Sequence, residues 1–273
     1  MTISDAIGGT WFNTYDSKMD IQCDLMSGLI SGTYSSTTGS TGTYVVLGAT
    51  QAGAPSPQPN GAGVPVSLLL FWRSNAGGKG DPSWNYVSGM CGQLIFDGAG
   101  EMQLQVMHQL VATEDFAYIQ RGWNSDKVIY TRSRPAGLGE TPVPDCPNLP
   151  EADVAPQTVT WTCQQDPAYN FQQPQNGRPF FAGDINFFAT QSRFLATVNS
   201  FNAPQTQEYK GLALSAMSTD PVSKVPMAVS LSGWIDRKTG LLNVIEMRGV
   251  SSEYKHRWAS VRSRFLTFTS SRD

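Results

Sequence analysis

The chain has little charge, few histidines and no long apolar run, and each shortage excludes a class of function. Only 15% of its 273 residues are charged, and its 19 lysines and arginines are scattered along a chain of net charge −3. No concentrated positive field is therefore available for nucleic acid or an anionic membrane surface. Nowhere do about 18 apolar residues follow one another, so we predict no membrane span. With two histidines, no Ser/His/Asp order and no glycine-rich phosphate loop, we predict that the chain is not an enzyme.

The first residues, MTISDAIGG, lack the basic segment and the apolar run of a secretory signal peptide. We therefore expect a soluble protein of the cytoplasm, or a secreted protein if a leader has been removed.

The cysteines form no CxxC pair, and the two histidines are far from them in sequence, so we expect no metal site and no cofactor. The chain has four cysteines, Cys23, Cys91, Cys146 and Cys163. Two interpretations stay open: a disulfide, for which Cys146 and Cys163 are the better candidates because they bracket a proline-rich segment, or buried free thiols. A cytoplasmic location favours the thiols.

Glycine (26 residues) and proline (17 residues) are plentiful, which suits short strands joined by many turns. In the clearest alternating run, Met102 to Leu110, apolar residues and His108 share one face and glutamines share the other, so we expect one buried face and one solvated face. Several such runs follow one another with turns between them and with no amphipathic helix of useful length, which is the pattern of an up-and-down meander. The pattern predicts an all-β protein made of up-and-down barrels, although an open sandwich also fits. Similar runs cover Met19–Cys23, Leu29–Tyr34, Tyr44–Leu47, Val66–Trp72 and Gly92–Phe96.

Repeated proline from Arg134 to Pro156 blocks both helix and central strand. We therefore predict a first domain over residues 1–134, a linker over 135–155 and a second domain over 156–273. A second proline- and glycine-rich stretch, Gly53 to Pro65, predicts a long surface loop.

Residues 8–132 resemble the avidin and streptavidin family in several ordered segments. These segments are GGTWFNTYDS, SGTYSS, SLLLFWRSN, VSGMCGQLIFDGAGEMQLQVMHQLV and RGWNSDKVIYTR. The resemblance implies an eight-stranded barrel that holds one small ligand, biotin or a biotin-like compound, in its mouth.

The resemblance also implies roles for individual residues. Asn13, Ser17 and Tyr34 fall where the family donates hydrogen bonds to the ureido oxygen of biotin, and Ser36 falls where it meets a ureido nitrogen. Trp72 would form an apolar wall of the pocket. Three such donors converging on one oxygen would be costly to leave empty inside a dry barrel.

Other positions depart from the family pattern or match it less securely. Ser88 falls near the biotin sulphur, but Met90 and His108 stand where aromatic residues line the pocket, and His108 could bond a polar ligand. Trp123 resembles the tryptophan that a family subunit lends to its neighbour. The stretch before the closing strand is shorter than in the family, so the group that meets the second ureido nitrogen has no secure counterpart, and Asp126 is only a candidate for it.

Residues 232–269 resemble the same hairpin and closing strand again, which predicts a tandem duplication. Trp161 would lie in the first strand of this repeat, where no ureido-binding trio remains. Glu246 and Arg248 fall on the inner face, which predicts a structural ion pair or, alternatively, a site for an anion. The second barrel would support the first and cap its pocket through Trp258.

We therefore predict a non-enzymatic binding protein for biotin or a similar ligand, assembled as a homo-oligomer of double barrels. The alternative is a diverged avidin-like barrel that has lost biotin and acts in defence, as a toxin, or in recognition of carbohydrate or protein. A barrel enzyme would require His108 and a nearby acid to share a pocket.

Overall fold

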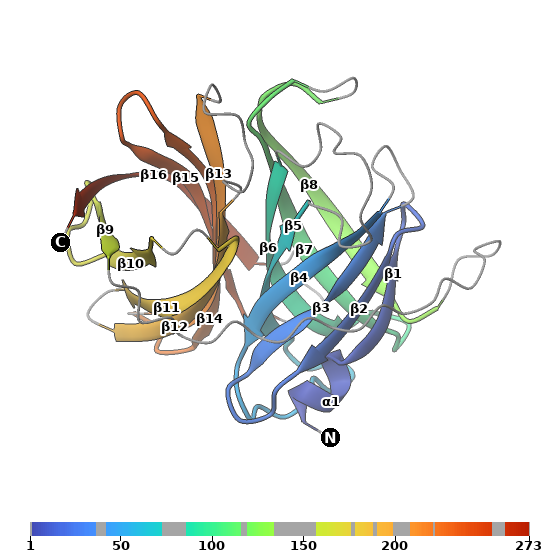
Figure 1. Cartoon of the computed structure of the whole chain (residues 1–273). Coiled ribbons are helices and arrows are strands. Elements are labelled where there is room, and N and C mark those ends of the chain that lie inside the picture. The colour runs from blue at the N-terminus through green and yellow to red at the C-terminus, as the bar shows by residue number, and fades with distance from the viewer. Residues whose placement is uncertain are drawn as a thin grey trace.

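The computed structural model describes residues 2–36, 42–72, 86–115, 119–133, 157–175, 178–187, 190–198, 208–220, 222–252 and 260–272. These residues form two closed eight-stranded antiparallel barrels that lie side by side (Figure 1), the first coloured blue to green and the second yellow to red. The predicted fold class is confirmed. The predicted linker over 135–155 lies outside the described residues.

Both barrels are simple meanders in which each strand pairs with the next and the last pairs with the first. The first barrel closes where Asn13 pairs with Tyr130, and the second closes where Cys163 pairs with Phe268. Closure leaves no free sheet edge in either barrel. The strands of the first barrel are β1 (Gly9–Asn13), β2 (Lys18–Cys23), β3 (Leu29–Ser36), β4 (Gly42–Thr50), β5 (Val64–Phe71), β6 (Tyr86–Phe96), β7 (Met102–Ala112) and β8 (Gly122–Thr131). The strands of the second barrel are β9 (Thr158–Cys163), β10 (Asn170–Pro174), β11 (Phe180–Phe187), β12 (Thr190–Val198), β13 (Tyr209–Thr219), β14 (Pro226–Asp236), β15 (Leu242–Val250) and β16 (Ser260–Arg272).

Two glycines show that the β6–β7 and β14–β15 hairpins are equivalent. A Cβ on Gly92 would lie 1.9 Å from the carbonyl oxygen of Gln105, and a Cβ on Gly233 would lie 1.9 Å from that of Asn243. Each glycine is therefore required by the same close approach of the neighbouring strand. This agrees with the tandem repeat predicted from the sequence.

A short helix that the sequence patterns did not predict, α1 (Ile3–Ile7), packs against one end of the first barrel (Figure 1). Thr2 and Asp5 form a capping box at its start. Ile3 and Ile7 are fully buried with Trp11, whose Nε1 donates to the Ile7 carbonyl at 2.7 Å. No helix of the described residues is long and apolar enough to cross a membrane.

Arg132, just after β8, fixes this end of the first barrel. Its guanidinium lies 3.8 Å from the Trp11 ring centroid and donates to the carbonyls of Ala6, Gly8 and Thr10 at 2.6–3.0 Å. The segment that leads into β1 is thus tied to the residue that follows β8, the last strand of the same barrel. The Gly53–Pro65 stretch forms the predicted loop up to β5, but Ile3 donates to its Ala54 carbonyl at 2.8 Å, so part of the loop is buried under α1.

The barrels pack on each other through their outer faces. Leu47 and Leu69 of the first barrel share an apolar cluster with Leu195 and Ala213 of the second. Polar contacts across the interface include the Ser67–Ser215 hydroxyl pair at 2.5 Å, the Gly63–Ser252 backbone hydrogen bond at 3.0 Å and two hydrogen bonds between Gln93 and Ser252.

The glutamine face of β7 differs from the expectation of a solvated face. Gln105 and Gln109 keep only 5% and 2% of their surface exposed, whereas the opposite face carries the predicted core residues Leu104, Val106 and Leu110. Alternation correctly assigned the two faces of the strand. It could not show that other parts of the molecule cover the outer face, because a face that packs through polar groups has the same pattern as a solvated one.

Candidate functional site

Three polar side chains predicted from the sequence meet inside the first barrel. Asn13 at the end of β1 donates through Nδ2 to the Tyr34 hydroxyl at 3.3 Å, while Asn13 Oδ1 accepts from the backbone nitrogens of Tyr15 and Ser17. The Ser17 hydroxyl is fully buried and makes no hydrogen bond of normal geometry, although it lies close enough to the Tyr34 hydroxyl to affect its pKa. Burial raises the pKa of Tyr34, and its neighbours Ser17, Asn13 and Tyr130 offset part of that rise. Tyr34 therefore stays a neutral donor and acceptor at neutral pH.

A second polar chain lies on the adjoining wall. Trp72 Nε1 donates to Ser88 Oγ at 2.7 Å, and Ser88 Oγ lies 2.8 Å from His108 Nε2. One proton arrangement satisfies all three groups, in which the Ser88 hydroxyl donates to Nε2 of a neutral His108 that carries its proton on Nδ1. The Trp72 ring also contacts Tyr34 and Tyr44, with ring centroids 5.8 Å and 5.1 Å away, so the two polar groups share one aromatic wall.

The protonation state of His108 follows from its position. Burial lowers its pKa to about 4, and the charge of the Asp126 carboxylate acts in the opposite direction. His108 is therefore neutral at pH 7, when it can accept a hydrogen bond but brings no positive charge to the barrel. His108 and Asp126 are cross-strand neighbours, yet this acid lies on the exposed part of β8 and accepts a hydrogen bond from Tyr15.

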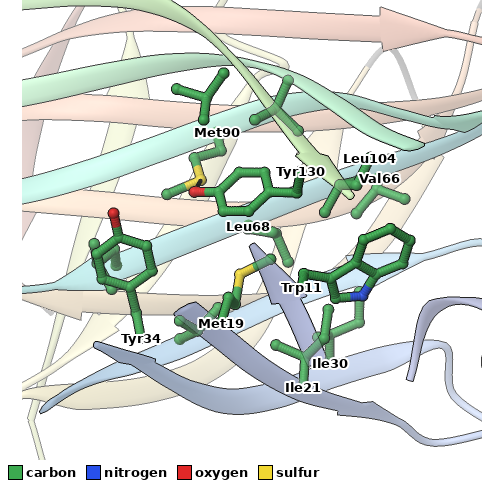
Figure 2. Close-up of a cluster of buried hydrophobic side chains, with 14 of the residues drawn as sticks. Trp11, Met19, Ile21, Ile30, Tyr34, Val66, Leu68, Met90, Leu104 and Tyr130 are labelled. Atoms are coloured by element: carbon green, nitrogen blue, oxygen red, sulfur yellow. Dashed lines mark hydrogen bonds between the residues drawn. The ribbon is translucent and has the colours of Figure 1, made fainter. Parts of the chain in front are cut away.

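Met90 and Tyr130 fill the interior beside the Asn13 group. The Tyr130 hydroxyl points toward the Met90 sulphur (Figure 2), 3.9 Å away, and both side chains are almost fully buried. The resemblance placed Met90 in the pocket wall but gave Tyr130 only a place in the closing strand. The pairing of Asn13 with Tyr130 across the closure of the barrel brings this second phenol to the site, and no local sequence pattern could reveal that pairing.

The remaining predicted site residues lie elsewhere or outside the described residues. Ser36 is buried two residues beyond Tyr34 on the same strand. Trp123 lies on the outer face of the first barrel, where its ring stacks on Trp234 of the second barrel at 3.7 Å between centroids. Trp258 lies outside the described residues.

The second barrel is filled differently. Its interior holds edge-to-face and tilted aromatic rings with centroids 4.7–5.8 Å apart, contributed by Tyr169, Phe171, Phe181, Phe187, Phe194 and Phe268. Glu246, 1% exposed, accepts from Arg248 Nη2 at 2.9 Å and from Arg264 Nε at 2.5 Å. The predicted Glu246–Arg248 pair is confirmed, and Arg264 of the neighbouring strand is a third member that the sequence did not suggest.

Cys23, Cys91 and Cys163 are free thiols, while Cys146 lies outside the described residues. Burial raises the pKa of Cys91, which keeps that thiol protonated. Within the described part of the chain, no group of three histidine, cysteine or acidic side chains is placed to hold a metal ion.

Comparisons with known proteins give a limited result. No family model matches the chain, and no curated protein matches it. Among solved structures, the crystal structure of Xenavidin matches 48% of this chain and 99% of its own, with 16% sequence identity and a TM-score of 0.37. The fold itself rests on the closed up-and-down topology of the two eight-stranded barrels, and a likeness at this identity and score is too weak to add to it.

Proposed function

We propose that the first barrel binds a small neutral ligand through a carbonyl or ureido oxygen, and that biotin is the first compound to test. The observation that supports this most is the buried group of Asn13, Ser17 and Tyr34, in which the Ser17 hydroxyl makes no hydrogen bond of normal geometry. An unsatisfied buried hydroxyl costs about 1–3 kcal/mol. A ligand oxygen that accepted hydrogen bonds from Ser17, the second hydrogen of the Asn13 amide and the Tyr34 hydroxyl would remove that cost.

The aromatic wall supports the same ligand class. Trp72 offers an apolar ring face, and its own Nε1 is already satisfied by Ser88, so the ring can cover a ligand without leaving a donor unpaired. The aromatic filling of the second barrel makes the first barrel the better binding candidate, with the second as its support.

The His108–Ser88 pair favours a second candidate, a more polar ligand than biotin. In the biotin pocket that the sequence resembles, an aromatic residue stands at the position of His108. A neutral imidazole that reaches Ser88 could instead turn to accept from a ligand hydroxyl or amide, as carbohydrate or peptide recognition would require.

Biotin titration, followed by calorimetry and by the melting temperature, tests the proposal. We expect one site per chain and a rise in melting temperature through linkage. Tyr34→Phe and Ser17→Ala should each weaken binding by about tenfold. Tyr169→Phe, which removes a buried hydroxyl from the second barrel, is the matched control and should leave the affinity unchanged.

Imidazolidin-2-one, a cyclic urea without the sulphur ring or the tail of biotin, separates the two candidates. If this urea binds and biotin does not, the polar trio is active but the His108 wall excludes biotin. If neither compound raises the melting temperature at saturation, the carbonyl-binding proposal is rejected. If biotin binds and both substitutions leave it unchanged, the assigned residues are wrong.

We further infer that double barrels associate into homo-oligomers, as the resemblance to avidins implies. Sedimentation velocity over a range of concentrations tests this, and a single monomeric species at every concentration would reject it.

A further inference from the structure

A groove of about 540 Å³ lies between the two barrels; its lining contains neither Asn13 nor Tyr34, but it includes β7 at His108, the partner of Ser88. One wall comes from the outer faces of β7 and β8, and the other comes from β15 and β16. Because a volume of 300–1,000 Å³ is typical of small-molecule sites, the groove is large enough for a small ligand.

Gln109 is the strongest sign of a ligand in this groove. Its side chain lines the groove with only 2% of its surface exposed, and its Oε1 accepts from Ser125 Oγ at 2.7 Å. The amide nitrogen Nε2 has no hydrogen-bond partner. Since buried amide donors are nearly always paired, an acceptor in the groove would complete the bonding of Gln109.

The charges around the groove indicate the sign of that acceptor. Lys127 lies on the outer face of β8 and lines the groove, and no described acidic residue does. Arg262 of the second barrel borders the groove along its strand, but it pairs with Arg248 across β15 and β16, so its side chain belongs to the inner face that carries Glu246 and Arg264. A cation and an amide donor form a local environment suited to an anion.

The rest of the lining is apolar. Met107 of the first barrel and Met247 and Val261 of the second belong to one inter-barrel cluster that borders the groove. Methionine side chains adapt their shape to irregular apolar ligands. A ligand that fits both parts of the groove therefore has an apolar portion and an anionic end.

We propose that this inter-barrel groove is a second binding site, for a small amphipathic carboxylate such as a medium-chain fatty acid. The carboxylate accepts from Gln109 Nε2 beside Lys127, and the hydrocarbon chain lies on Met107, Met247 and Val261. Residues of both barrels form the site, which neither barrel offers alone.

Octanoate binding to the full chain tests the proposal, with calorimetry for affinity and methyl resonances of the methionines for location. We expect one octanoate per chain and shifts of the Met107 and Met247 methyl signals. Gln109→Glu should weaken binding by at least about tenfold because it places a negative charge beside the carboxylate. Gln109→Leu, which removes the donor without adding charge, provides a second variant if the first does not fold.

Two controls test whether octanoate binding depends on the cation of the groove and on the charge of the ligand. Lys127→Gln should weaken octanoate several-fold, whereas Arg193→Gln, which removes an exposed cation that does not line the groove, should leave the affinity within about twofold. Octan-1-ol, of the same length but uncharged, should bind more weakly than octanoate.

Three results would overturn the inter-barrel site. They are no saturable octanoate binding at millimolar concentration, unchanged affinity in both Gln109 variants, and loss of octanoate binding in Tyr34→Phe or in the presence of biotin. The last result would place octanoate in the first barrel. Failure of biotin to bind has no bearing on the groove, so the two proposals fail separately.

Discussion

The pKa of His108 shows how burial inside a barrel changes the protonation of a side chain. Its pKa falls from 6.5 to about 4 because burial disfavours the charged imidazolium. Between these values the unfolded chain binds more protons at this residue than the folded chain, so its contribution to stability is lost as the pH falls through that range.

We therefore expect the free energy of unfolding to drop by about 1–2 kcal/mol from this group between pH 7 and pH 5. Urea denaturation at the two pH values measures the drop in the wild type and in His108→Gln, which cannot titrate. The variant should lose this part of the pH dependence and keep the part that arises from carboxylates. An equal drop in both proteins would show that His108 titrates normally.

Glu246 is a buried carboxylate whose charge is balanced by two arginines. Its side chain is 1% exposed, whereas the side chains of Arg248 and Arg264 are 17% and 40% exposed. Glu246→Gln would leave both guanidiniums beside a neutral amide in the second barrel. Because the arginines are partly hydrated, we expect a loss of about 2–3 kcal/mol, below the full cost of breaking a buried pair.

Chemical denaturation of Glu246→Gln against Glu208→Gln measures this loss. Glu208 pairs with Arg121 at 3.8 Å, with both side chains about half exposed, and removing it should change stability by less than about 0.5 kcal/mol. If the two variants are equally stable, the Glu246 cluster makes no net contribution.

At the scale of elements, the equivalent glycines of the β6–β7 and β14–β15 hairpins allow a paired test of the repeat. Gly92→Ala and Gly233→Ala each force a methyl group against a carbonyl oxygen of the neighbouring strand. We expect each substitution to destabilise its own barrel by about 2–3 kcal/mol, because backbone rather than a movable side chain must shift.

Gly183→Ala is the control, since its Cβ would press on the ring edge of Phe194 at 2.9 Å while the nearest backbone atom, the Gln172 carbonyl oxygen, is at an ordinary 3.6 Å, and ring movement should limit the loss. Hydrogen exchange resolved by segment shows which barrel each substitution loosens. A large effect of only one of Gly92→Ala and Gly233→Ala would mean that the two hairpins are not energetically equivalent.

At the scale of the whole molecule, the inter-barrel interface couples two closed barrels that could each fold around a core of their own. Gly89 of β6 lies at its centre, where a Cβ would stand 2.3 Å from Ser230 Oγ and 3.0 Å from Ser232 Oγ. The stacked Trp123–Trp234 pair adds an aromatic contact across the same interface.

Gly89→Leu should separate the barrels without entering either core. We expect the wild type to unfold in one calorimetric transition and the variant to show two, because the coupling free energy is lost while each core stays intact. Scanning calorimetry, with the ratio of calorimetric to van't Hoff enthalpy, measures this. One unchanged transition in Gly89→Leu would show that the interface does not couple the barrels.

Sequence alone determined the all-β class, the strand faces and the duplicated hairpin, because alternation of apolar residues and glycine-rich turns are local properties. The described strands contain the predicted runs, from Met19–Cys23 in β2 to Met102–Leu110 in β7. Thr2 and Asp5 have the Thr-x-x-Asp spacing of a capping box, a local signal for α1 that strand periodicity does not detect.

Only the tertiary structure decided which side chains meet. Closure brings Tyr130 beside Asn13, the pairing of β15 with β16 brings Arg264 to Glu246, and the packing of one barrel on the other buries Gln109 and stacks Trp123 on Trp234. These contacts join residues that are distant in sequence, and their energy depends on desolvation, which the whole fold creates. The pattern that predicts a strand therefore cannot tell a solvated glutamine from the buried, unpartnered amide of Gln109.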